Sequence, residues 1–220
     1  LLLLCWPVAT TSSSCGGGEA LVVHSADDLA EFATQACTTY TGHFRVKDST
    51  DIADFEPFSS LTELAGGDLG VVSNRALTSL YGLRNVAGAV EGVIWIQMNA
   101  KLESLRGLEG LTSVGQAEDI SVYVAGNDML YSIQGLQGLR GALPGALKIS
   151  DNPVLVSLDG LDGITAIEGL SSTGSAIYVT SNLQLRSIAG LDGVQGALRG
   201  ALVVASTRSR SGTASLHSYT

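Results

Sequence analysis

The chain has 220 residues, a net charge of −9 and 45% hydrophobic residues. Because this is ample apolar material for a core, wholesale disorder is excluded. The 12 lysines and arginines are scattered along the chain, whereas nucleic-acid binding needs a clustered basic surface. We therefore expect no nucleic-acid partner.

The first segment is a short apolar run, Leu1 to Ala9, followed by small polar residues up to Gly18. This order is typical of the tail of a signal peptide, and the run is too short to span a bilayer. An unstructured apolar N-terminus is the alternative. We expect residues 1–18 to be a signal-peptide remnant and a flexible tether, with no transmembrane span and an extracellular or cell-surface location.

A short helix is predicted directly after this segment. Ser25 is followed three residues later by Asp28, and Leu29 and Phe32 supply an apolar side. This is the pattern of a capped helix start. We expect the helix to cover the open end of the first repeat unit.

The rest of the chain is dominated by an internal repeat that is marked by asparagine. Asn74, Asn99, Asn127, Asn152 and Asn182 are separated by 25, 28, 25 and 30 residues. Aliphatic residues lie 3, 6, 9 and 12 positions after each of them, and glycine lies 8 positions after each. Ser49 takes the asparagine place one repeat earlier. Since the longer repeats restore the same phase, chance alignment of leucines does not explain the pattern.

Each of the five asparagines is preceded by aliphatic residues at positions −5 and −3, and the same alternation of apolar residues occurs twice upstream and once downstream; it is the pattern of a strand with one buried face. The pairs are Leu21/Val23, Phe44/Val46, Leu69/Val71, Ile94/Ile96, Val122/Val124, Leu147/Ile149, Ile177/Val179 and Leu202/Val204. We therefore predict eight strands in one parallel sheet. A single repeat has too little apolar surface to fold alone, so stacking must build the core.

The predicted fold is an all-β, right-handed parallel β-solenoid of about seven coils over residues 19–206, with the N-terminal capping helix. The asparagine side chains should bond turn backbone and the next asparagine of the stack. The glycines should serve a corner that needs positive φ or close approach. Extra residues should form loops near Gln116–Asp119 and Gly169–Ser175, and residues 207–220 should be a disordered tail.

Catalytic motifs are missing from the sequence. The three histidines have no zinc-site spacing, and no G-x-S-x-G motif or phosphate loop is present. We expect no enzyme, no cofactor and no metal. The less favoured alternative is a polysaccharide-active enzyme that uses Glu109, Asp159, Asp162 and Asp192 as paired acids.

If positions −5 and −3 point inward, then positions −4 and −2 point outward. The outward positions include Arg45, Trp95, Gln97, Tyr123, Lys148 and Tyr178. Exposed aromatic residues beside cations suit recognition of a protein or a glycan. The alternative is cross-strand stacking that only stabilises the sheet.

The motif L-x-[IV]-x-x-N-x-x-L-x-[SL]-L-x-G-L resembles that of the receptor L domain. This is a leucine-rich β-helical domain found in the ectodomains of insulin- and growth-factor-type receptors and in microbial surface proteins. An ordinary leucine-rich repeat usually has leucine at +2 after asparagine, whereas here leucine lies at +3 after all five asparagines. The resemblance covers roughly residues 15–205. It implies a recognition scaffold but not receptor signalling.

The segment from Cys37 to Val46 is similar to the first coil of that family, in which an earlier cysteine pairs with this one around the capping helix. Cys15 is in the matching place. The resemblance thus implies a Cys15–Cys37 disulfide worth about 3 kcal/mol. Alternatively, Ser12-Ser-Ser-Cys15-Gly is similar to a bacterial lipoprotein cleavage site, which would make Cys15 a lipid anchor.

The preferred function is therefore non-catalytic recognition of a protein or glycan ligand through the exposed face of the sheet. A passive structural protein of the cell envelope or matrix is the main alternative.

Overall fold

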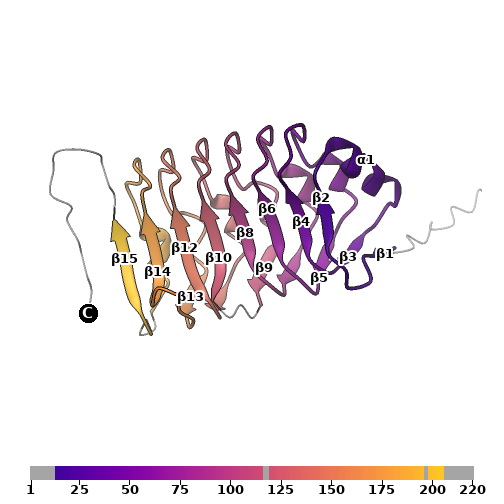
Figure 1. Cartoon of the computed structure of the whole chain (residues 1–220). Helices are drawn as coiled ribbons and strands as arrows, with labels where there is room; N and C mark the ends of the chain where they lie inside the picture. Colours follow the sequence, from indigo (N-terminus) through magenta and orange to yellow (C-terminus); the bar gives the residue numbers. More distant parts are fainter. Residues whose placement is uncertain (1–12, 116–118, 196–197, 206–220) are drawn as a thin grey trace, which may run out of the picture.

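The structure is a computed structural model that describes residues 13–115, 119–195 and 198–205. Most of the expected leader, residues 116–118 of the first expected loop, and the expected tail over 207–220 lie outside this part of the chain. The described chain consists mostly of strands in parallel sheets, with one α-helix at its N-terminal end (Figure 1).

The main sheet has eight strands, as the alternation at positions −5 and −3 predicts. The strands are β2 (Leu21–Val23), β4 (Phe44–Lys47), β6 (Leu69–Val72), β8 (Ile94–Gln97), β10 (Ile120–Ala125), β12 (Ala146–Ser150), β14 (Ser175–Thr180) and β15 (Ala201–Ala205). They lie in sequence order, and every neighbouring pair is parallel. Figure 1 shows the eight arrows side by side and pointing the same way.

Three smaller sheets, which the sequence analysis did not predict, run behind the main sheet. They join β1 (Ser14–Cys15), β3 (Thr39–Thr41) and β5 (Glu63–Ala65); β7 (Gly88–Val90) and β9 (Leu111–Val114); and β11 (Gly141–Leu143) and β13 (Ile164–Ile167). Their signal is a further buried apolar position 15 or 16 residues after the asparagine position. Leu64, Val90, Val114, Leu143 and Ile167 occupy it.

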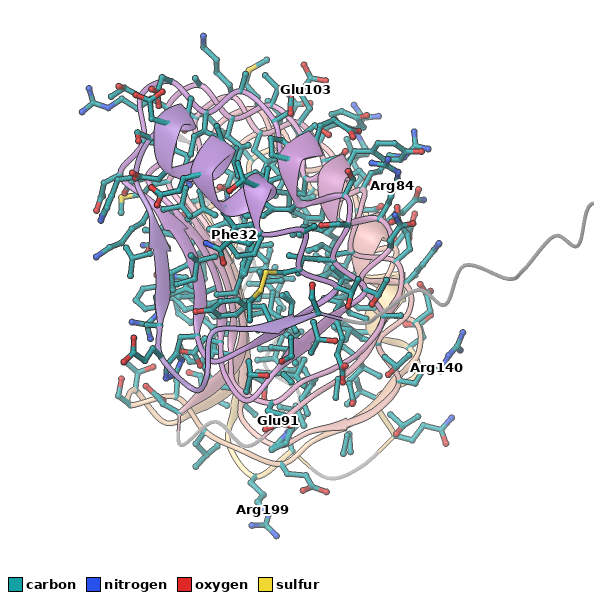
Figure 2. All side chains as sticks on the ribbon, turned by 90° about the vertical axis from the view of Figure 1, so that its right-hand side faces the viewer. Phe32, Arg84, Glu91, Glu103, Arg140 and Arg199 are labelled. Carbon is teal, nitrogen blue, oxygen red and sulfur yellow. A yellow bond between two sulfur atoms is a disulfide. The ribbon has the colours of Figure 1, made fainter. Side chains whose placement is uncertain are left out.

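The aliphatic columns form one continuous core. The inward residues from β4 to β14 are almost fully buried, and the end residues Leu21, Leu202 and Val204 pack partly against them. In Figure 2, which looks along the stack from the N-terminal end, Phe32 lies inside the ring of chain, while Arg84, Glu103, Arg140 and Arg199 lie at its rim. The predicted inward face of the sheet is therefore confirmed.

The corners between sheets show why glycine recurs eight residues after asparagine. Four corners are 3-10 turns: η1 (Glu56–Phe58), η2 (Tyr81–Leu83), η3 (Gln134–Leu136) and η4 (Ala189–Leu191). A Cβ on Gly82 would collide with the carbonyl oxygen of Phe55 in the preceding repeat, so close approach explains that glycine. Gly107 and Gly160 have φ of +112° and +108°, and a Cβ on either would also come too close to the backbone of the preceding repeat. The expectation of positive φ or close approach is thus confirmed, and at these two glycines both reasons apply.

The asparagines form a buried ladder along the stack. The side-chain oxygen of Asn127 accepts the backbone N–H and the side-chain amide of Asn99, at 3.0 and 3.1 Å. The Asn127 amide in turn donates to the carbonyl oxygen of Ile96 and to Asn152, both at 3.1 Å. The same pattern runs from Ser49 to Asn182. The ladder therefore satisfies buried polar groups and ties each repeat to the next.

The residue before each ladder position has positive φ, which the sequence analysis missed. These residues are Asp48, Ser73, Met98, Gly126, Asp151 and Ser181, with φ between +54° and +65°. The left-handed conformation ends the strand and turns the following asparagine toward the interior. Only the enrichment in Asp, Ser and Gly at this position was a signal for it.

The N-terminal helix α1 (Ala26–Thr34) has the predicted capping box. Ser25 Oγ accepts the Asp28 N–H at 3.1 Å, and the Asp28 carboxylate accepts the Ser25 N–H at 3.1 Å. Hydrogen bonds from the backbone N–H of His24 and from Ser25 lower the pKa of Asp28, although burial opposes them. The ring of Phe32 packs against that of Phe58, with the two ring centroids 5.2 Å apart. Helix α1 therefore covers the apolar end of the first repeats, as expected.

Asn127→Ala should lower the free energy of unfolding by at least about 3 kcal/mol, because several buried polar groups would lose their partners. Urea denaturation followed by circular dichroism measures this. Asn85→Ala is the matched control, since its exposed side chain makes one hydrogen bond, to the Ser59 carbonyl oxygen; it should cost less than about 1 kcal/mol. Equal losses in the two variants would show that the ladder is not a main source of stability.

Candidate functional site

The outward residues of the main sheet form one row across the strands. Trp95 is the register partner of Tyr123, Tyr123 that of Lys148, and Lys148 that of Tyr178. The row therefore contains four of the predicted site residues, on β8, β10, β12 and β14. We call these four residues the outward row.

Within the outward row the side chains contact one another face to face. The rings of Trp95 and Tyr123 stack with centroids 6.0 Å apart and planes 23° apart. The Lys148 Nζ lies 4.6 Å from the ring centroid of Tyr123 and 5.4 Å from that of Tyr178. Tyr123 is thus covered by Trp95 from one neighbouring strand and approached by Lys148 from the other.

Gln97 links the first two rings through their polar edges. The Trp95 Nε1 donates to the Gln97 Oε1 at 3.0 Å, and the Gln97 Nε2 donates to the Tyr123 hydroxyl at 3.4 Å. Trp95 is 43% exposed, and it is the most accessible ring of the outward row. Gln97 thereby fixes the orientation of a large exposed indole, which lowers the entropic cost of using it in binding.

Arg45 does not join this group. It lies two strands from Trp95, and its guanidinium donates to Asp68 at 2.9 Å. Burial raises the pKa of Asp68. This effect is outweighed by hydrogen bonds from the Val93 N–H and from Arg45 and by the charges of His43 and Arg45, so the pKa of Asp68 stays below its ordinary value. The Arg45 charge is therefore compensated internally, and Arg45 serves as an ion-pair partner at this position.

A surface hollow of about 260 Å³ lies at the other end of the outward row. Lys148 and Tyr178 line it together with Ile120 and with Ser171, Ser172, Thr173 and Ser175. Sequence reasoning did not assign these serines and threonine to a site. The available signal was the insertion of the 30-residue repeat, whose loop was predicted near Gly169–Ser175. In the structure this loop covers residues 168–174, and Ser175 already belongs to β14.

The loop over the hollow is held by its own hydrogen bonds. The Gly174 N–H donates to the Ser171 carbonyl oxygen at 2.8 Å, and the Ser171 N–H donates to the Ser175 carbonyl oxygen at 2.8 Å. The Ser171 hydroxyl lies 2.9 Å from that of Thr173 and accepts the Ser175 N–H at 3.2 Å. The hydroxyl wall of the hollow is therefore preformed.

The carboxylates considered for catalysis have structural or exposed positions. Glu109 accepts the Gly107 N–H at 2.7 Å, and Asp162 accepts the Gly160 N–H at 2.9 Å, so each supports a positive-φ corner. Asp159 and Asp192 are exposed. Residues 13–115, 119–195 and 198–205 contain no cluster of three or more metal-ligating side chains, and no described helix is long and apolar enough to cross a bilayer.

Cys15 and Cys37, which are 22 positions apart in the sequence, are joined in a disulfide that closes a loop containing α1. Cys37 is buried, and Cys15 packs partly against the core. A sulfur in this bond cannot carry a lipid, so the two hypotheses for Cys15 exclude one another in the mature chain.

Mass spectrometry of the mature protein should find Cys15 linked to Cys37 and carrying no lipid. Reduction should add two hydrogens and lower the free energy of unfolding by about 3 kcal/mol, because the unfolded chain gains freedom. Cys37→Ser, which cannot form the bridge, should unfold like the reduced protein. A lipid on Cys15 would exclude the bridge.

Comparisons of the chain with protein-family models, with curated proteins and with solved structures find no match. The likeness to the receptor L domain therefore stays a prediction from the repeat motif, and the arguments about function rest on the geometry of the outward row and the hollow.

Proposed function

We propose that the chain is a right-handed β-solenoid of the receptor L-domain kind that acts, without catalysis, as a recognition module at the cell surface or outside the cell. The sequence-ordered parallel sheet, the asparagine ladder and the buried aliphatic columns support the solenoid. A disulfide supports an oxidising compartment, since such bonds persist mainly in exported proteins.

The observation that carries the recognition proposal is the continuity between the outward row and the hollow. Lys148 and Tyr178 belong to both. An accessible indole at one end and a preformed polar hollow at the other give a ligand-sized surface on one face of the sheet. Binding sites combine apolar contact area with a few placed polar groups, and this face has both.

A passive structural role is the second candidate, and two observations favour it. The rings of the outward row are covered partly by one another, which stabilises neighbouring strands whether or not a ligand binds. In addition, β15 is an edge strand of the main sheet in the described part of the chain, and an edge strand can pair with a second molecule.

Trp95→Ala separates these two functions. On an array of glycans and cell-surface proteins, recognition through the outward row predicts at least a tenfold weaker binding of whichever ligand the native chain selects, because the most accessible ring is lost. Thermal unfolding, measured in parallel, should show that the variant remains folded.

Tyr131→Ala is the matched control, since Tyr131 is an aromatic residue that is 51% exposed and lies after the strand, outside the outward row. Its binding should equal that of the native chain. If Trp95→Ala lowers stability and leaves binding unchanged, or if the native chain binds nothing on the array, the recognition proposal fails and the structural role is preferred.

A further inference from the structure

The cation in the hollow, Lys148, forms no ion pair with any carboxylate in the part of the chain that the structure describes. Within residues 13–115, 119–195 and 198–205, ion pairs join Arg45 and His43 to Asp68 and Arg84 to Glu56, and none includes Lys148. Lys148 is also the only charged residue among those that line the hollow in this part of the chain. Although the net charge of −9 opposes anion binding in general, an ammonium that is not paired with a described carboxylate attracts an anion locally at the wall of the hollow.

The ammonium is held in place without being neutralised. Its Nζ lies 4.6 and 5.4 Å from the ring centroids of Tyr123 and Tyr178. Such cation–π contacts orient the group but leave its full charge. A lysine that is already ordered loses less side-chain entropy when an anion binds, so the two tyrosines prepare the charge for a ligand.

The remaining wall of the hollow is neutral and rich in hydroxyl groups. Ser171, Ser172, Thr173 and Ser175 can each donate and accept hydrogen bonds. A protein anchor would instead favour an apolar, fully desolvated pocket. The hollow of about 260 Å³ is smaller than the roughly 300–1,000 Å³ of sites for drug-sized ligands, which suits one ring-sized group.

From these observations we propose that the hollow binds one acidic sugar unit of an oligosaccharide, with its carboxylate or sulfate on the Lys148 ammonium and its hydroxyls on the Ser171–Ser175 loop. Adjoining sugar units lie along the outward row, against the edges of Tyr123 and Trp95. This inference rests on the proposed recognition function and names the ligand class for it.

The test is isothermal titration of the full chain with three oligosaccharides of equal length: an oligogalacturonate, a sulfated galactan fragment and a neutral galactan fragment. At least one acidic probe should bind about tenfold or more tightly than the neutral one, because a charge-assisted contact is added. Comparison of the two acidic probes shows whether the carboxylate or the sulfate is the preferred group.

Lys148→Met keeps the stem and removes the charge, so it should abolish the preference for the acidic probe, and Lys148→Arg should retain most of it. Lys47→Met is the matched control, because Lys47 is an outward lysine on β4, far along the same sheet; the preference should be unchanged. Ser172→Ala should weaken binding of acidic and neutral probes alike.

Equal binding of acidic and neutral probes would overturn the inference, as would equal effects of Lys148→Met and Lys47→Met. If no saccharide binds while a protein on the array binds through Trp95, the acidic-sugar inference fails and the recognition proposal stands. If neither saccharides nor proteins bind, both fail.

Discussion

The buried asparagine ladder is the constraint on which the other features of this structure depend. From Asn99 to Asn182, each asparagine side-chain oxygen accepts two N–H groups from the asparagine of the preceding repeat, which thereby donates onward along the stack. Since strand side chains alternate with period two, a slip of one residue would turn every inward side chain outward. By fixing where each strand ends, the ladder favours one register, and that register places Tyr123, Lys148 and Tyr178 in line.

Much of the fold follows from the sequence because the repeat is regular. Eight parallel strands, their inward columns and the capped helix are predictable from aliphatic spacing and from Ser25 and Asp28. The smaller sheets were missed because each strand is short and contributes few buried side chains; Val90 and Leu143 alone give little periodicity. The positive φ of Met98 was also hidden, since methionine does not favour that conformation.

The candidate site was predictable only in part, for a physical reason. Alternation places Trp95, Tyr123, Lys148 and Tyr178 on one face, and the structure shows them in contact. The hollow instead depends on how the inserted loop folds back over β12 and β14, which hydrogen bonds of Ser171 and Gly174 decide. No periodic pattern encodes such a loop. Arg45 and Lys148 both occupy an outward strand position, so nothing in the sequence pattern separates them. The carboxylate that pairs with Arg45 belongs to Asp68, which lies before β6 and is not part of the alternating pattern.

The contacts within the outward row stabilise the sheet and, in the proposed function, also shape the binding surface. Both roles require the strand register that brings these side chains together, so this register is the central claim. Oxidative cross-linking of engineered cysteine pairs, with peptide mass spectrometry, tests it most directly. Lys148→Cys with Tyr178→Cys joins register partners and should form a disulfide readily, whereas Lys148→Cys with Thr180→Cys is offset by two residues and beyond the reach of about 7 Å between Cα atoms. Preferential cross-linking of the offset pair would contradict the register, and with it the row and the hollow.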